Sequence, residues 1–185
     1  QANVEIVDSA IREVREHSLV TADGREHPCD VLIYGTGFTA TDFLAPMRIR
    51  GLDGMELNQA WKDGAEAYKG ISVSGFPNLF LLYGPNTNLG HNSILYMLES
   101  QYAYVLGCMR ALREQRLRYL DLRARVQRAY NLDLQQATHR TIWAQGCDSW
   151  YQTATGKHTN NWPGFTFTYR LMTRTPELAD YDCVR

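Results

Sequence analysis

The sequence lacks any closely spaced pair of cysteines. Its four cysteines, at positions 29, 108, 147 and 183, are scattered over 185 residues. A zinc ribbon or a redox dithiol needs two cysteines a few residues apart, so both are excluded and no metal site is expected. Disulfide frameworks belong mainly to short secreted chains, so we expect reduced thiols in a cytoplasmic protein.

The sequence also lacks a long apolar run and a net charge. No run approaches the roughly 20 residues that span a bilayer, and no secretory signal is visible, so we expect no membrane partner. The formal net charge of −1 and the 44% of hydrophobic residues are typical of a globular protein. The first residue is Gln1 rather than methionine, so we expect a processed or truncated product.

The charge balance hides one local excess of arginine. The cluster comprises Arg110, Arg113, Arg116, Arg118, Arg123, Arg125 and Arg128. Such a cluster can bind nucleic acid or phosphate, and a non-catalytic α/β interaction module is our alternative function. Arginines also suit a solvated helix end, near the negative pole of the helix dipole. Because no stacking aromatics are interleaved in a strand pattern, we favour the solvated helix end and expect no nucleic-acid partner.

Short β-prone runs open the chain. They cover residues 4–7, 11–15 and 19–21, and residues 22–25 carry a turn pattern. Compact apolar runs at residues 31–34 and 79–83 predict two strands of the kind buried on both faces of a parallel sheet. Residues 39–75 show no sustained periodicity and predict a long irregular connection.

Two helices are predicted after the second buried strand. The first begins near Ser93, with Asn92 or Ser93 as its N-cap, and keeps apolar residues at helical spacing as far as Leu112. The second is predicted over residues 124–144. After Gly146 the chain is rich in aromatic residues and glycine and predicts a packed irregular flap.

A glycine motif follows the first apolar run. Residues 31–40 match a strand followed by GxGxxA, the dinucleotide-binding fingerprint. A true fingerprint opens a helix, but Pro46 lies within the residues that follow. We interpret Gly35, Thr36 and Gly37 as a turn of small residues, which lets a ligand or another domain approach the backbone.

The most informative stretch is residues 76–93. An apolar run breaks at Gly84-Pro85, passes through a polar loop and enters the first long helix. The N–H groups at a helix start have no partners within the helix. This arrangement favours an anion or an electron-rich ring above the strand end.

Several segments together resemble class B flavoprotein monooxygenases, which comprise the Baeyer–Villiger and the flavin-containing monooxygenases. Residues 30–38, DVLIYGTGF, are similar to the family's D-x4-A-T-G-F/Y segment, with Gly35 in place of alanine. Further segments agree in order and spacing: Trp61 with residues 64–70, then residues 75–80, 84–86, 98–101, 148–151 and 156–157. The series looks most like the Baeyer–Villiger branch near the hydroxyacetophenone type.

The resemblance implies an α/β fold, the C-terminal part of a flavoprotein with two dinucleotide-binding domains, with short β-strands followed by long helices. It implies that residues 1–37 are the last strands of the NADPH-binding domain and residues 38–75 the interdomain crossing. Residues 76–120 would be the C-terminal return of the FAD-binding domain, and residues 121–185 a C-terminal helical cap. The family's glycine motifs for FAD and NADPH do not occur in these residues, so missing N-terminal regions are the expected partner.

The implied function is that of an enzyme, a flavoprotein monooxygenase that uses FAD and NADP. It would insert one oxygen atom of O2 into a ketone, or oxidise a soft heteroatom, through a C4a-peroxyflavin. We expect the chain to be inactive alone, and a homodimer through exposed apolar faces is open.

The resemblance also assigns cofactor-binding residues but no catalytic one. They are Gly35, Thr36, Gly37, Gly84, Pro85, Asn86, His91, Asn92, Ser93, Ile94, Trp150 and Lys157. The amides around Asn92, Ser93 and Ile94 would face the flavin, and Trp150 with Lys157 would approach NADP.

Overall fold

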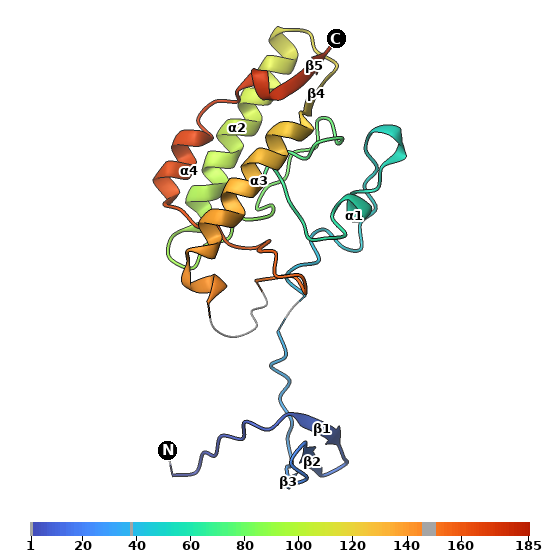
Figure 1. The fold of residues 1–185 in the computed structure, drawn as a ribbon, viewed down its shortest axis with the longest axis vertical. Coiled ribbons are helices and arrows are strands. Elements are labelled where there is room, and N and C mark those ends of the chain that lie inside the picture. The colour runs from blue at the N-terminus through green and yellow to red at the C-terminus, as the bar shows by residue number, and fades with distance from the viewer. Residues whose placement is uncertain (1, 38, 146–150) are drawn as a thin grey trace. The chain divides into compact units, whose positions relative to one another are not determined.

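The computed structural model describes residues 2–37, 39–145 and 151–185. The chain divides into two compact units, Gln1–Phe38 and Thr39–Arg185. The regular elements of the first unit are strands, whereas those of the second are helices and a two-stranded ribbon (Figure 1). Short strands therefore precede long helices, as the sequence predicts.

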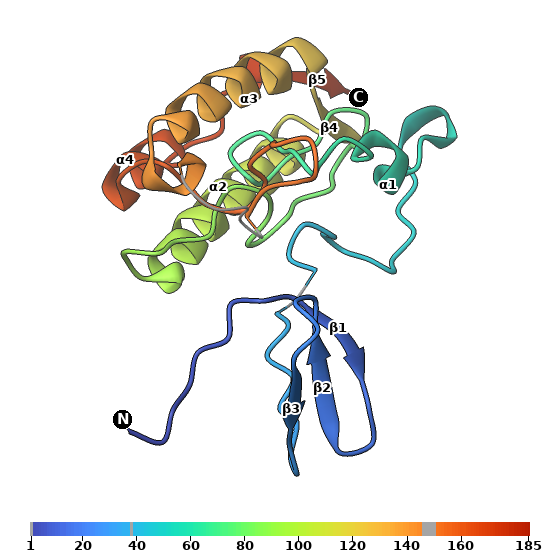
Figure 2. The same ribbon diagram turned by 60° about the horizontal axis from the view of Figure 1, so that its bottom comes forward.

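The first unit is built around an antiparallel sheet of three strands. These are β1 (Ile11–Val14), β2 (Ser18–Thr21) and β3 (Glu26–Pro28), with β2 in the middle (Figure 2). The predicted turn joins β2 to β3, and Gly24 there adopts a φ of +84°, which residues with a Cβ rarely take. The predicted strands at residues 11–15 and 19–21 are confirmed, whereas residues 4–7 form no strand.

The two buried strands predicted from apolar runs are wrong for this chain. In the first run Val31, Ile33 and Tyr34 are exposed, and no described residue pairs with them as a strand. In the run at residues 79–83 only Phe80 forms a bridge, to Ser72. The physical reason is that a buried strand needs backbone partners on its edges, and apolar side chains alone do not supply them.

The second unit begins with the irregular connection that the sequence predicts. Its only regular pieces are the 3-10 turn η1 (Leu52–Gly54) and the single-turn helix α1 (Leu57–Ala60). Leu57 and Trp61 are buried there against Val73 and Phe76. A local apolar cluster therefore orders this segment in place of secondary structure.

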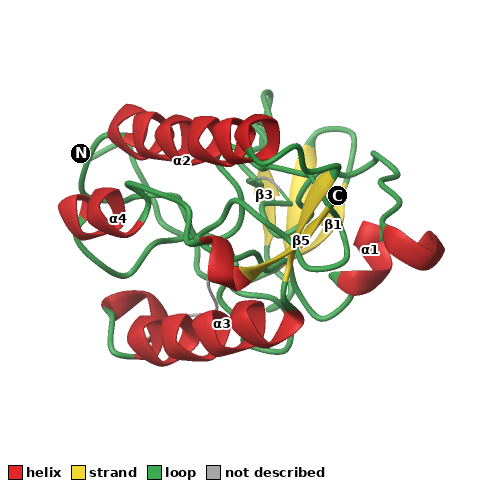
Figure 3. Cartoon of the chain, turned by 90° about the horizontal axis from the view of Figure 1, so that it is seen from above, coloured by secondary structure: helices red, strands yellow, loops and turns green. Residues whose placement is uncertain are grey.

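Two long helices lie on opposite sides of the irregular segments (Figure 3). Helix α2 (Ile94–Glu114) begins directly after Ser93, as predicted. Helix α3 (Ala124–His139) begins where predicted but ends five residues early, and a 3-10 turn, η2 (Ile142–Ala144), follows. The hydroxyl and the amide of Thr141 both bond the Thr138 carbonyl, at 2.7 and 2.9 Å, so local bonds replace the helical ones.

The C-terminal elements pack against α2. Helix α4 (Thr166–Met172) contacts α2, and the turn η3 (Leu178–Asp180) leads into β5 (Tyr181–Val184). Strand β5 pairs antiparallel with β4 (Tyr119–Leu122). The flap predicted after residue 146 is indeed irregular from residue 151 to 165.

A tyrosine-rich core joins these elements. The buried hydroxyls of Tyr104 and Tyr181 lie 2.8 Å apart, and Tyr181 also lies 2.9 Å from the Ser72 hydroxyl. Tyr68 donates to the Asp180 carboxylate at 2.7 Å. Burial raises the pKa of Cys108 in this core to about 12, so its thiol stays protonated at neutral pH.

One face of α2 is left uncovered in the described part of the chain. Its apolar stripe consists of Leu95, Tyr102, Leu106 and Met109, which are 49–70% exposed. These residues recur at helical spacing and so lie on one side of the helix. The helices of the described part include none that is long and apolar enough to cross a membrane.

The arginine cluster lies around the end of α2 and the start of α3. Six of its seven side chains are exposed, and the half-buried Arg123 pairs with Asp182 at 2.9 Å. Exposure agrees with solvated helix ends, and the interaction-module alternative stays a prediction.

Candidate functional site

The predicted Gly84–Asn86 turn is packed tightly against its own chain. A Cβ on Gly84 would lie 2.3 Å from the Gly70 carbonyl oxygen, so only glycine fits there. Asn86 donates from its amide nitrogen to the His158 carbonyl at 2.9 Å. The turn is thus held between residue 70 and residues 151–162, which we call the strap.

The start of α2 is open rather than buried. Ser93 is the N-cap, but its side chain makes no capping bond. Instead the Asn92 side-chain oxygen accepts the Ser93 N–H at 2.7 Å, and the Asn92 amide nitrogen donates to Thr166. No acceptor for the Ile94 N–H is found among the described residues, so this donor at the positive end of α2 is available.

A hollow lies next to His91, two residues before the N-cap of α2. It measures about 200 Å³, and its lining includes the rings of His91, Trp143 and Phe165. The rings of His91 and Trp143 are stacked, with centroids 6.4 Å apart and planes 29° apart. An apolar cavity of roughly 150 Å³ is known to take up benzene, so this hollow has room for one aromatic ring.

The strap directly precedes Pro163, Gly164 and Phe165, which line the hollow. Its Thr159 amide bonds the Tyr151 carbonyl, which brings Gln152 opposite His158. The Lys157 ammonium bonds the Glu66 carboxylate at 2.8 Å and the Gly64 carbonyl at 2.9 Å. Lys157 therefore ties the strap to residues 64–66 in this structure. Trp150 lies outside the described residues.

Gln101 on α2 supports the turn from behind. Its fully buried side chain accepts the Tyr83 N–H at 2.8 Å and donates to the Tyr169 hydroxyl at 3.0 Å. Tyr169 in turn donates to the Lys69 carbonyl at 2.6 Å. The chain entering the Gly84 turn is thereby linked to α4 through one glutamine.

Lys69 is a buried amine next to this network. It donates to the Met172 carbonyl at 2.7 Å and lies 4.7 and 5.0 Å from the rings of Tyr68 and Tyr104. Burial lowers the pKa of Lys69, because the charged form loses water. Its bond to the last turn of α4 and its two rings mark it as a structural group.

The predicted small-residue turn belongs to the other unit. Gly35, Thr36 and Gly37 are exposed, and Gly37 has a φ of +80°. A Cβ on Gly35 or Gly37 would meet nothing within 4 Å. The turn therefore has space beside it, and its role at a cofactor stays a prediction.

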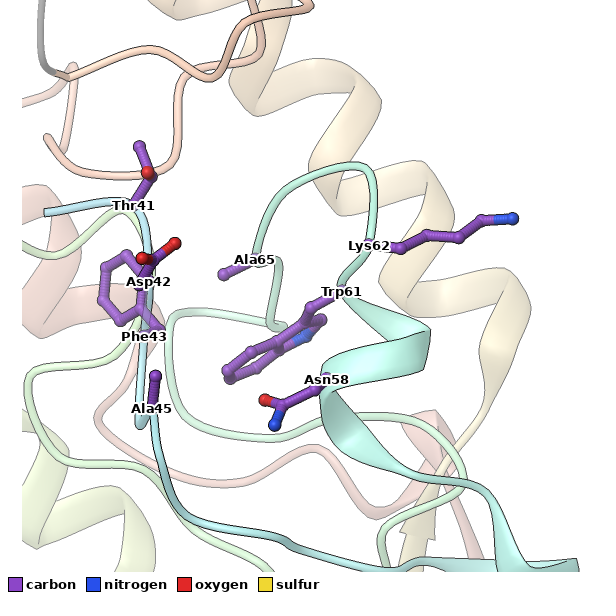
Figure 4. A pocket seen from close by; sticks show the side chains of 8 residues that line it. All are labelled: Thr41, Asp42, Phe43, Ala45, Asn58, Trp61, Lys62 and Ala65. Atoms are coloured by element: carbon purple, nitrogen blue, oxygen red, sulfur yellow. The ribbon is translucent and has the colours of Figure 1, made fainter. Parts of the chain in front are cut away.

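A second hollow lies beside α1 (Figure 4). It measures about 260 Å³, and its walls include Phe43 and Trp61, whose rings already pack edge to face with centroids 6.4 Å apart. The Trp61 indole donates to the Glu66 carbonyl at 2.9 Å, and the Lys62 side chain points away. Helix α1 beside this hollow has only four residues, whereas α2 has 21, so the hollow near the start of α2 is the better candidate.

Comparison with known proteins identifies the wider context. No family model matches the chain. The chain is 44% identical over 182 residues to a Baeyer–Villiger monooxygenase of Pseudomonas aeruginosa, covering 97% of this chain and 34% of that protein. It is 42% identical over 185 residues to a Baeyer–Villiger monooxygenase of Streptomyces coelicolor, covering 99% and 36%.

Solved structures agree with these relatives. The chain superposes on the closed crystal structure of cyclohexanone monooxygenase with a TM-score of 0.81 and 28% identity, covering 99% of this chain and 36% of that one. The NADP+-bound cyclohexanone monooxygenase of Rhodococcus sp. Phi1 gives a TM-score of 0.79 and 26% identity, covering 100% and 36%. The chain belongs to the Baeyer–Villiger monooxygenase family. It spans about a third of the length of these relatives and matches their C-terminal part.

Sequence reasoning missed several residues of this site. Trp143 and Phe165, which line the hollow with His91, were assigned only to a helix end and an irregular flap. Gln101 and His158 were also missed. A glutamine within an apolar helix stripe was an available signal for Gln101, whereas no local pattern indicates the contacts of Trp143 or His158.

Proposed function

We propose that this chain is the cofactor-facing C-terminal part of an FAD- and NADPH-dependent Baeyer–Villiger monooxygenase. In the proposed reaction one atom of O2 enters the bond between a ketone's carbonyl carbon and its neighbour. The other atom leaves as water, and NADPH supplies the two electrons. A soft heteroatom is the alternative acceptor of oxygen. Bound FAD would supply the chemistry with O2, and the chain would position the cofactor and provide part of the electrostatic field around it.

The single observation that carries the proposal is the open start of α2. The Ile94 N–H, for which the described residues supply no acceptor, lies three residues after His91 of the aromatic hollow, at the positive end of a 21-residue helix. Such a helix end stabilises a nearby negative charge by roughly 0.3–1 kcal/mol. An N–H donor at the positive end of a helix suits the electron-rich edge of a flavin. Ser93 donates to Asn92 instead, so we assign the contact to Ile94 in preference to Ser93.

The aromatic wall has a separate role. His91, Trp143 and Phe165 line the hollow with flat ring surfaces. Flat apolar walls exclude water and orient a planar ligand. We propose that these rings shield the flavin edge or the substrate from water. We also propose that Lys157 and Trp150 contact bound NADP.

The uncovered apolar surfaces of the chain favour the proposal that it is part of a larger protein. The apolar stripe of α2 is exposed, and the apolar runs at residues 31–34 and 79–83 lack strand partners in the described structure. Relatives carry about twice as much further chain. We propose that this additional polypeptide supplies the missing sheet, that the chain is inactive without it, and that the whole is a cytoplasmic enzyme with reduced thiols.

A chimera tests the function. This chain would replace the corresponding C-terminal part of the Pseudomonas aeruginosa relative, and flavin absorbance and ketone-dependent NADPH oxidation would be measured. We expect a yellow protein that oxidises NADPH and converts ketones to esters. A folded chimera without flavin would overturn the proposal.

Ile94→Pro tests the helix amide within that chimera. Proline is tolerated at the first helical position and removes only the N–H, and Ser93 already has the extended backbone that must precede it. We expect FAD affinity to fall about 3- to 10-fold, since one hydrogen bond contributes roughly 0.5–1.5 kcal/mol.

Two controls separate the amide from other effects. Ile94→Ala keeps the N–H and removes the side chain. Ala124→Pro places proline at the first position of α3, after an equally extended Arg123. Unchanged FAD affinity in Ile94→Pro, or an equal loss in Ile94→Ala, would contradict a contact between this amide and the flavin.

A further inference from the structure

The strap contains a buried histidine whose proton position follows from its neighbours. The Gln152 side-chain nitrogen lies 3.1 Å from the Trp143 carbonyl and 3.0 Å from Nε2 of His158. A carbonyl oxygen only accepts, so the Gln152 group facing it is the NH2 donor. The same NH2 faces Nε2 of His158, so Nε2 must be an acceptor. The His158 ring is therefore neutral, with its proton on Nδ1.

The backbone of His158 is anchored independently of its ring. Gln135 on α3 accepts the His158 N–H at 3.0 Å and donates to the His158 carbonyl at 2.7 Å. The same carbonyl accepts from Asn86. The backbone of His158 is thus a fixed point, joined to α3 and to the Gly84–Asn86 turn, and the ring projects from it.

Gln152 extends this fixed point to the hollow. It connects the His158 ring to the Trp143 carbonyl, and the Trp143 indole stacks on His91. Trp143 and Gln152 also lie on either side of residues 146–150 in the chain. One glutamine therefore holds the aromatic wall of the hollow to the strap.

We propose that Gln152 and the neutral ring of His158 form a latch that positions Trp143, and that protonation of His158 opens it. An imidazolium donates from both nitrogens, so Nε2–H would then face the NH2 of Gln152. The glutamine cannot turn its oxygen to His158 without turning that oxygen toward the Trp143 carbonyl as well. The effect of the latch on a bound cofactor rests on the proposed function.

The surroundings of His158 determine the direction in which its pKa is shifted. The ring of His139, in the last turn of α3, lies edge to face with it at 5.8 Å. The other side chains bonded to His158 are neutral: Gln152, Gln135 and Asn86. Burial, and then the charge on His139, lowers the pKa of His158 below its ordinary value of 6.5. The latch is therefore closed at neutral pH and opens as pH falls below 6.5.

Nitrogen-15 NMR of the chain, recorded as a function of pH, tests the latch without any flavin. We expect the Nδ1–H form of His158 at pH 7.5 and protonation below pH 6.5. The Trp143 indole signal, assigned by Trp143→Phe, should move with the same midpoint. His139→Gln should raise that midpoint, since it removes a like charge.

Substitutions at Gln152 isolate the link. In Gln152→Leu we expect the Trp143 signal to lose its response to His158, while His158 still titrates. Gln152→Glu should raise the His158 midpoint, because a carboxylate accepts from the imidazolium. Gln136→Leu, at an exposed position of α3, is the matched control and should change neither signal.

Either of two results would overturn the latch. One is a proton on Nε2 of His158 at pH 7.5, and the other is a Trp143 signal that ignores the His158 titration in the unmodified chain. Neither result bears on flavin binding by the chimera, and a colourless chimera would leave the latch intact.

Discussion

At the residue scale, polar side chains in the interior decide how the site is supported. Gln101, Tyr169 and Asn86 are buried, and the side chain of each bonds a backbone group of a distant segment. Buried donors and acceptors are costly when unpaired, so such side chains act as fixed connections. The open loop at the start of α2 depends on these connections, because it has little secondary structure of its own.

Gln101→Leu tests this support. Leucine leaves the Tyr83 N–H without its acceptor, and an unsatisfied buried donor costs about 1–3 kcal/mol. We expect the free energy of unfolding, measured with urea, to fall by about that amount. Gln115→Leu at the exposed end of α2 is the control and should cost less than about 0.5 kcal/mol. Equal losses in the two variants would show that Gln101 has no special role.

At the element scale, α2 organises the second unit. It supplies Gln101 and Tyr104 to the core, contacts α4 and β4, and begins three residues after His91 of the hollow. Its interior glycine is explained by packing, because a Cβ on Gly107 would lie 2.6 Å from Cδ of Pro176. The loop after α4, which contains Pro176, can therefore pack against α2 only because residue 107 has no side chain.

Gly107→Ala should destabilise the protein although alanine favours helices. Alanine gains about 1 kcal/mol of helix propensity over glycine, but forcing a methyl group into a packed contact costs about 1–3 kcal/mol. We expect a lower midpoint of thermal unfolding. Adding Pro176→Ala to Gly107→Ala should restore stability, and a double variant no more stable than Gly107→Ala would contradict the contact.

At the scale of the whole molecule, the exposed apolar stripe of α2 is the main unsatisfied surface. Contiguous apolar surface of this kind is typical of an interaction site. The chain matches about a third of its relatives' length, and the stripe belongs to a helix with a cofactor-facing start in the proposed function. A stripe that further polypeptide would cover should make the isolated chain associate with itself.

Leu106→Lys tests that expectation. A lysine in the middle of the stripe puts a charge into any apolar contact. We expect sedimentation velocity to show concentration-dependent association of the chain and a several-fold weaker association of the variant, as a desolvated charge costs at least 1–3 kcal/mol. Gln115→Lys adds the same charge off the stripe and should associate like the unmodified chain. A strictly monomeric chain would contradict the prediction.

The sequence alone determined the features that depend on local pattern. The spacing of apolar residues located α2 and the start of α3, Gly24 marked the hairpin turn, and the ordered motifs indicated the family. These features follow from periodicity, capping and backbone freedom, which act over a few residues.

Only the tertiary structure decided the rest. It left residues 31–34 and 79–83 without strand partners, brought Trp143 onto His91, and joined His158 to Asn86 across 72 residues. Strand pairing, ring stacking and buried hydrogen bonds join groups that are distant in the chain. The energy of these contacts depends on which distant residue becomes the partner, and the local sequence does not specify that residue.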